Sequence, residues 1–115
     1  MQPSRSSLLE IIKAAATEEE LRESVVYIIP NIKAAETVLV NRKPFTTELP
    51  CVLLFIDLEP YANWSHKCRY LLVDKDGKVQ LKQAGQYPPD TEKLQLFLKP
   101  ASVQEWMLLT DKLYG

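Results

Sequence analysis

Apolar side chains recur at helical spacing over the first part of the chain. Ser7 with Glu10, and Thr17 with Glu20, each place a hydroxyl three residues before a carboxylate, which is the arrangement of a helix capping box. Two leucines lie within the first pair and two isoleucines follow it, and an alanine run precedes the second pair. This pattern predicts two short helices, or one bent helix, over about residues 7–23.

From residue 25 onward, short runs of β-branched and aromatic residues replace the helical pattern. Segment 51–58 is almost continuously apolar, as expected of a buried strand, whereas 78–82 alternates between apolar and polar side chains, as in an antiparallel sheet with one wet face. The proline after 25–29 favours a strand there, with a helix over 17–29 as the alternative. The predicted strands are 25–29, 37–40, 51–58, 68–74, 78–82 and 94–98, with loops at 41–50, 59–67 and 83–90.

Turn residues predict how two of these strands pair. The run Asp74-Lys75-Asp76-Gly77 is typical of a hairpin turn, with the glycine placed for positive φ. If 51–58 and 68–74 also form a hairpin, position 57 lies opposite 68 and position 51 lies opposite 74. The two cysteines, Cys51 and Cys68, then sit at opposite ends of the ladder, too far apart for a disulfide.

The end of the chain predicts a further helix. Ser102 with Glu105 forms another capping box, and an apolar stripe follows at Val103, Trp106, Met107, Leu109 and Leu113. Together the elements indicate a single α+β domain over residues 1–115. In it, an antiparallel sheet of about four to six strands packs against an N-terminal helix or helix pair and against the C-terminal helix.

Composition and charge narrow the classes of function. The 115 residues include 14 Lys and Arg against 15 Asp and Glu, a formal net charge of -1, which disfavours a nucleic-acid binder held by a strong basic field. We find no secretory leader and no apolar run of membrane-spanning length in the sequence. The two cysteines form no disulfide framework. We therefore expect a cytoplasmic protein that binds neither nucleic acid nor membrane.

The densest group of chemically versatile side chains lies in segment 57–70, between two predicted strands. Tyrosine, tryptophan and arginine anchor many protein interfaces, and loops between rigid strands present such residues to solvent. The residues that we expect to bind a partner are Tyr61, Trp64, His66, Arg69 and Tyr70. The alternative is a structural plug, in which this loop packs its aromatic side chains over the end of a small core.

The same segment raises the question of catalysis or metal binding. A nucleophilic Cys68 needs an adjacent base, here His66, oriented by Asp57 or Asn63, but side chains two apart on a strand rarely meet. Cys51 is too distant in the predicted hairpin to complete a metal site. The chain also contains no nucleotide-binding or serine-hydrolase motif. We expect no catalytic residue, no metal and no cofactor.

Two carboxylates at the start of the segment have a simpler explanation. Asp57 and Glu59 point to the same side of an extended chain, where paired carboxylates can divide acid and base roles. They lie at a strand end beside a proline, where water is expected. We interpret both as solvated or paired with Arg69.

The sequence therefore favours a non-enzymatic protein-interaction or regulatory domain. Its partner would be another protein, or a second copy of the chain paired along an exposed strand edge. One alternative is a small-ligand carrier whose pocket lies between a helix and a curved sheet, with Trp64 and Trp106 at its mouth. The other is a small hydrolase or transferase that uses Cys68 and His66.

Overall fold

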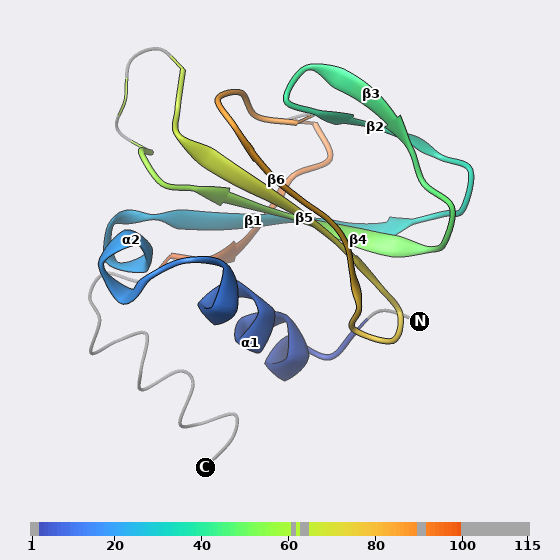
Figure 1. Cartoon of the computed structure of the whole chain (residues 1–115), viewed down its shortest axis with the longest axis horizontal. Coiled ribbons are helices and arrows are strands. Elements are labelled where there is room, and N and C mark those ends of the chain that lie inside the picture. Colours follow the sequence, from blue (N-terminus) through green and yellow to red (C-terminus); the bar gives the residue numbers. More distant parts are fainter. Residues whose placement is uncertain (1–2, 61, 63–64, 90–91, 100–115) are drawn as a thin grey trace.

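The computed structural model describes residues 3–60, 62, 65–89 and 92–99. Helices α1 (Arg5–Ala15) and α2 (Glu18–Glu23) come first (Figure 1). The strands in the described part of the chain are β1 (Val25–Ile32), β2 (Thr37–Val40), β3 (Lys43–Thr46), β4 (Cys51–Asp57), β5 (Cys68–Asp74), β6 (Val79–Gly85) and β7 (Gln95–Leu98). The predicted α+β class is confirmed, and the helix expected after Ser102 lies outside the described residues.

Helix α1 begins earlier than the sequence pattern predicts. Its N-cap is Ser4, whose Oγ accepts the Ser7 backbone N–H at 3.2 Å. The expected capping box of Ser7 with Glu10 is therefore wrong, because Ser7 lies inside the helix. The Ser4 hydroxyl satisfies a free N–H group at the start of the helix. The helix therefore begins nearly one turn before Leu8, the first buried residue of its apolar face.

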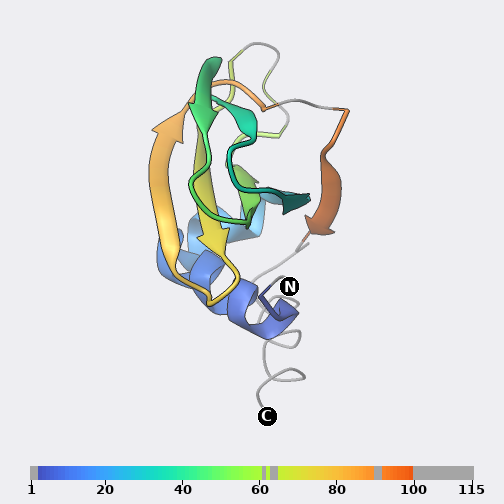
Figure 2. The same cartoon turned by 90° about the vertical axis from the view of Figure 1, so that its right-hand side faces the viewer.

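Five strands form an antiparallel sheet in the order β6-β5-β4-β1-β7, while β2 and β3 form a separate hairpin. The helices lie on one side of the sheet and the β2–β3 hairpin lies on the other (Figures 1 and 2). The pairing of β4 with β5 confirms the predicted register, with Asp57 opposite Cys68 and Cys51 opposite Asp74. Gly77 in the following turn has a φ of 83°, as expected.

Strand β6 runs on to Gly85, so the first part of the predicted 83–90 loop is strand. Two other departures from the prediction occur at residues with positive φ angles. Strand β1 continues beyond Pro30 to Ile32, with an irregularity in its pairing to β4 where Asn31 has a φ of 57°. The predicted 41–50 loop contains β3, which pairs with β2 across a tight turn. Pro44 is tolerated there because a two-stranded hairpin leaves many of its N–H groups without a strand partner.

The predicted alternation of β7 is only partly correct. Leu98 is buried, but Leu96 is 62% exposed although the pattern placed both on the inner face. The pairing of β7 with β1 changes register between Val26 and Tyr27. That shift places Leu96 and Leu98 on opposite faces, because a slip of one residue exchanges the two faces of a strand. Leu96 therefore points away from the core.

Each face of the sheet carries its own apolar core. On the helix side, residues of α1 such as Ile12 pack with alternate residues of the sheet, among them Leu54. On the other side, Val38 of β2 packs with the remaining residues, among them Leu53. Leu53 and Leu54 are both 0% exposed. Fully burying a leucine contributes about 1.5–3 kcal/mol, so both layers stabilise the central strand.

Arg69 joins the helices to the sheet. It donates two hydrogen bonds to the Glu20 carboxylate, at 3.0 and 2.7 Å, and one to the Ala15 carbonyl oxygen at 2.7 Å. The predicted capping box of Thr17 with Glu20 is confirmed, with reciprocal hydrogen bonds of 2.9 and 3.1 Å. The carboxylate that caps α2 thus also binds the sheet. Arg69 pairs with Glu20 rather than with Asp57 or Glu59, because residue 69 faces the helix side of β5.

Gly85 occupies a position in β6 with no space for a side chain. A Cβ there would lie 2.5 Å from Cε2 of Tyr70 and 3.0 Å from the side chain of Asn41. We expect Gly85→Ala to lower the free energy of unfolding by about 1–3 kcal/mol, the range for overpacking, as measured by urea denaturation. In a Tyr70→Leu background, which lacks the clashing ring carbon, the same substitution should cost less. An equal cost in both backgrounds would contradict the steric explanation.

The Arg69 contact makes stability depend on pH in the acid range. The hydrogen bond from Arg69, followed by that from the Thr17 backbone, lowers the pKa of Glu20 from 4.5 to about 2. Because the folded pKa lies below the unfolded one, the stabilisation is complete above the unfolded value and is lost as the pH falls towards the folded value. Because solvent screens the contact, we expect it to contribute about 1 kcal/mol to the free energy of unfolding at neutral pH. Urea denaturation of wild type from neutral to strongly acidic pH measures this loss.

Two carboxamide variants identify the residue responsible. Glu20→Gln should lack this component of the acid dependence, while Glu19→Gln, on the exposed side of the same helix, should keep it. An unchanged acid dependence in Glu20→Gln would show that the Arg69 contact does not cause it.

Candidate functional site

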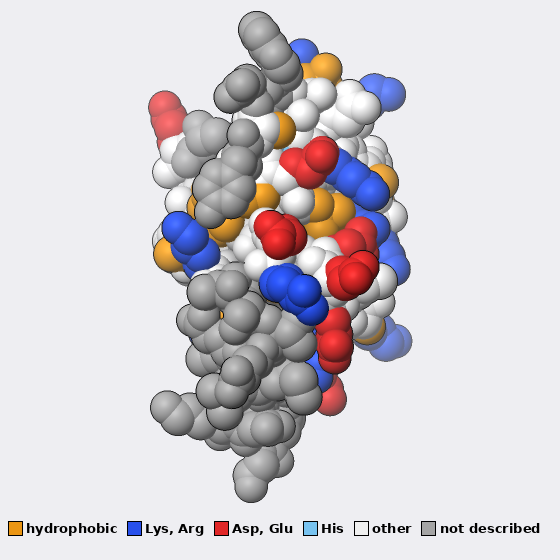
Figure 3. All heavy atoms as spheres, turned by 90° about the vertical axis from the view of Figure 1, so that its left-hand side faces the viewer, with side chains coloured by type: hydrophobic (Ala, Val, Ile, Leu, Met, Phe, Trp, Pro, Cys, Tyr) orange, Lys and Arg blue, Asp and Glu red, His pale blue; other side chains and the backbone are white. Residues whose placement is uncertain are grey.

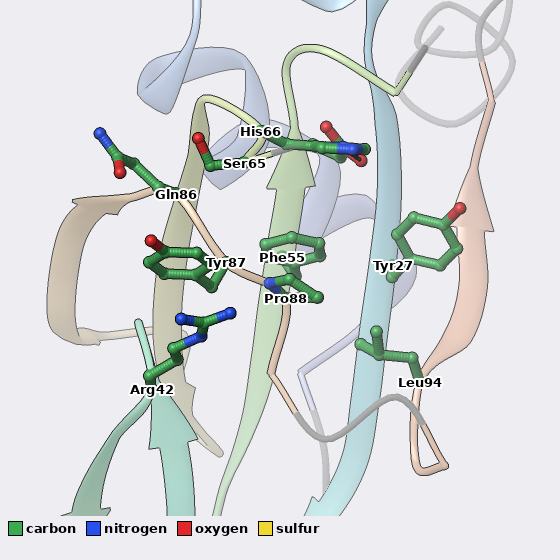
Figure 4. Close-up of a pocket in the computed structure, with 10 residues that line it drawn as sticks. Tyr27, Arg42, Phe55, Ser65, His66, Gln86, Tyr87, Pro88 and Leu94 are labelled. Carbon is green, nitrogen blue, oxygen red and sulfur yellow. Dashed lines mark hydrogen bonds and ion pairs between the residues drawn. The ribbon is translucent and has the colours of Figure 1, made fainter. Parts of the chain in front are cut away.

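A cleft of about 770 Å³ opens on the face of the sheet opposite the helices. Its apolar lining consists of Tyr27, Phe55, Tyr87, Pro88 and Leu94. Its polar lining consists of Arg42, Asp57, Ser65, His66 and Gln86. These residues come from β1, β4, the β2–β3 turn, the segment before β5 and the connection between β6 and β7 (Figure 4). The pocket of the carrier hypothesis was expected against a helix, but this cleft lies on the other face.

Asp57 and His66 form a fixed pair at one end of the cleft. The Nδ1 of His66 lies 2.8 Å from Oδ2 of Asp57, whose Oδ1 accepts the Glu59 backbone N–H at 3.0 Å. The backbone N–H of His66 donates to the Gln86 carbonyl oxygen at 2.8 Å. Because an ionised carboxylate only accepts, Nδ1 carries the proton in this contact, and in the singly protonated tautomer Nε2 is an acceptor. The His66 side chain is 25% exposed, so a ligand can reach it.

The turn between β2 and β3 presents Arg42 to the cleft. Asn41 and Arg42 have positive φ angles of 52° and 67°, the combination found in type I′ turns, where glycine and asparagine are favoured over arginine. The Asn41 Oδ1 accepts the Gln86 N–H at 3.0 Å, which ties the turn to the β6–β7 connection. The guanidinium carbon of Arg42 lies 3.6 Å from the centre of the Tyr87 ring. This contact is a cation–π stack.

Aromatic rings line the bottom of the cleft. Figure 4 shows the side chains of Tyr87, Phe55 and Tyr27 in a row across three parts of the chain. The rings of Tyr27 and Phe55 are 6.2 Å apart, and Tyr70 lies beyond Phe55 at 5.4 Å, measured between centroids. Tyr70 is 0% exposed, and burial raises the pKa of its hydroxyl. The cleft therefore offers an apolar wall of aromatic rings that are tilted relative to one another.

The structure separates the residues that the sequence analysis grouped as a binding site. Of Tyr61, Trp64, His66, Arg69 and Tyr70, only His66 lines the cleft in the described part of the chain. Arg69 faces the helices and Tyr70 is buried beneath the cleft. Tyr61 and Trp64 lie outside the described residues, so the loop's role as a site or as a plug stays a prediction.

Sequence reasoning missed Arg42, Tyr27, Tyr87 and Gln86 as neighbours of His66. Their separation along the chain gives no local signal for a shared site. The one available signal was Asn41, because asparagine favours positive φ and lies between two strand-forming runs. A hairpin predicted there would have brought Arg42 to a sheet face.

Neither cysteine is placed to act as a nucleophile. Cys68 is 0% exposed and donates through its thiol to the Tyr87 carbonyl oxygen at 3.8 Å, and burial raises its pKa. Burial, with the charges of Glu36 and Asp74, also raises the pKa of Cys51 to about 11. The His66 ring donates to Asp57 instead of facing a thiolate. The site thus holds an oriented imidazole and a guanidinium, without an activated thiol.

Other site types receive no support in the described part of the chain. No three His, Cys, Asp or Glu side chains of the described residues gather in a way that could hold a metal ion. None of the described helices has the length and hydropathy to span a lipid bilayer. Figure 3 shows the end of the molecule near α2, where acidic and basic side chains lie next to one another. This face therefore presents a mixed charge.

Comparison with protein-family models, with curated proteins and with solved structures finds no match to this chain.

The state of the thiols predicts slow alkylation. With buried thiols of raised pKa, native protein at mildly alkaline pH should react with iodoacetamide at least about a hundredfold more slowly than urea-unfolded protein. Mass spectrometry of timed samples measures the two rates. As a positive control, Ser65→Cys places a thiol at an exposed position of the cleft, where labelling should be fast. Rapid native labelling of Cys68 would revive the Cys/His enzyme hypothesis.

Proposed function

We propose that this chain is a non-enzymatic protein-interaction domain whose cleft receives a segment of a partner protein. The supporting observation is an open concavity of about 770 Å³ whose walls include Tyr27, Phe55, Tyr87 and Arg42. Aromatic side chains and arginine contribute most of the binding energy in many protein interfaces. The cleft replaces the loop of segment 57–70 as the centre of the proposed interface and retains His66 from it.

The absence of an accessible thiol in the described structure supports a binding role over a catalytic one. Both cysteines are buried and free, a state that also suits the reducing, cytoplasmic compartment that we propose. The Asp57–His66 pair could orient a base, but neither cysteine presents a thiolate to it. The same imidazole serves well as a fixed hydrogen-bonding group for a ligand.

A small-ligand carrier is the second candidate, and the size of the cleft favours it. Pockets for small molecules commonly have volumes of roughly 300–1,000 Å³ and few, well-placed polar groups. The cleft at about 770 Å³ falls inside that range. A protein segment and a small molecule would use the same walls, so an experiment must separate them.

A homodimer through a sheet edge is a further proposal for the partner. Strand β6 lies at one margin of the five-stranded sheet, and its Val79 is 44% exposed. Two copies could pair there by main-chain hydrogen bonds. We favour the cleft because it combines apolar area with charged anchors.

A phage-displayed random-peptide library tests the proposed function. Selection on wild-type protein should enrich peptides whose affinity falls at least about tenfold in Leu94→Glu, because that substitution puts a charge into the apolar part of the cleft. Isothermal calorimetry with the synthesised peptides measures the affinity. The matched control is Leu96→Glu, which makes the same change two residues along at a position 62% exposed and outside the cleft lining, and it should bind like wild type.

The other outcomes discriminate between the candidates. Enriched peptides that bind all three proteins equally would place the interaction elsewhere on the surface. Failure to enrich any peptide, together with binding of apolar small molecules that Leu94→Glu abolishes, would favour the carrier. Urea denaturation of both variants checks that the loss of binding is not a loss of folding.

A further inference from the structure

The charges of the cleft point to the chemistry of its occupant, an inference that rests on the proposed function. We propose that the cleft recognises an aromatic side chain with a neighbouring carboxylate, presented by an extended segment of a partner protein. The ring lies over Phe55, and the carboxylate binds the guanidinium of Arg42.

The cleft contains a cation that pairs with no carboxylate of the described residues. Arg42 and Asp57 are the guanidinium and the carboxylate of its described lining. Asp57 is already occupied, since one oxygen accepts from the Glu59 backbone and the other from His66. Arg42 stacks on Tyr87 and pairs with no carboxylate of the described residues. A ligand therefore meets an unused cation, which calls for an anion.

The geometry of Arg42 suits a planar anion. Stacking on Tyr87 covers one flat face of the guanidinium and leaves its N–H groups at the edge, where they can bind both oxygens of a carboxylate. The position also has a φ of 67°, which arginine adopts less readily than glycine. A disfavoured backbone conformation thus carries, at the cleft, a guanidinium that pairs with no described carboxylate.

The apolar part of the cleft suits an aromatic ring. The rings of Tyr87, Phe55 and Tyr27 form its bottom (Figure 4), and aromatic pairs prefer the offset and tilted contacts that such a surface permits. In the singly protonated tautomer that donates its Nδ1 hydrogen to Asp57, Nε2 of His66 is an acceptor. An indole N–H or a phenol O–H could donate to that nitrogen. Tryptophan and tyrosine therefore fit the cleft better than phenylalanine or aliphatic residues.

N-acetyltryptophan and N-acetyltryptophanamide are matched probes for this chemistry, because they differ only in the carboxylate. Each is titrated into ¹⁵N-labelled protein, and amide chemical shifts report both affinity and location. We expect wild type to bind the acid about five- to tenfold more tightly than the amide. The largest shifts should lie at Tyr27, Phe55, Gln86 and Tyr87. In Arg42→Gln the affinity ratio should fall to about one.

Two further variants separate the charge of Arg42 from other effects. Arg42→Gly suits the positive φ better than arginine, so it should stay folded and still lose the preference for the acid. Lys43→Gln removes an exposed positive charge from the adjacent residue and should keep the wild-type ratio. The proposal is overturned if neither probe binds, if wild type binds both equally, if the preference survives in Arg42→Gln, or if the shifts lie outside the cleft.

The titrations and the peptide selection together distinguish a failure of this ligand chemistry from a failure of the proposed function. Selected peptides that bind in the cleft but lack an acidic residue beside an aromatic one would uphold the interaction domain and overturn this chemistry. An Arg42-dependent preference for the acid without any selected peptide would uphold the chemistry for a free aromatic acid and overturn the protein-segment partner.

Discussion

All seven residues of β4 are buried, and the rest of the fold follows from that constraint. A strand that alternates its side chains between two faces can exclude water from both only if each face is covered. The helices cover the side of Leu54, and the β2–β3 hairpin covers the side of Leu53. The hairpin is short, so its cover is incomplete. Beyond the hairpin, the segments that carry His66 and Tyr87 stand over Phe55 and Asp57, and the cleft lies between these segments and the hairpin turn.

The hairpin keeps its place through polar contacts as well as apolar ones. The buried Thr47 hydroxyl lies 2.6 Å from the Lys33 carbonyl oxygen and 3.1 Å from the Glu36 backbone N–H, so it closes the base of the hairpin against the β1–β2 connection. At the other end, Asn41 binds the Gln86 backbone. At the Thr47 end these hydrogen bonds offset the cost of burying a hydroxyl, whereas the Asn41 contact is exposed to solvent.

Sequence periodicity predicted correctly those helices and strands whose local sequence pattern matches their environment in the folded protein. The apolar run of β4 and the symmetric connection to β5 gave the correct register, and the capping box at Thr17 marked the start of α2. The hairpin was missed because its turn uses Asn41 and Arg42 instead of glycine. Strand β3 also contains a proline, which argues against a strand in most contexts.

The candidate site was harder to predict than the fold. Arg69 and Tyr70 are neighbours in sequence, but consecutive residues of a strand point to opposite faces, so one binds the helices and the other lies under the cleft. The strand assignment of 68–74 already implied this separation. In contrast, the meeting of Arg42, Tyr27 and His66 depends on tertiary structure, because they come from three separate parts of the chain.

A single residue of the main chain connects the two sides of the cleft. Gln86 donates its N–H to Asn41 at the hairpin turn and accepts the N–H of His66 through its carbonyl oxygen. The turn that carries Arg42 and the segment that carries His66 are therefore mechanically coupled through one residue. Moving either side relative to Gln86 strains one of these two hydrogen bonds. In hydrogen–deuterium exchange, the amides of Gln86 and His66 would then exchange as one cooperative unit.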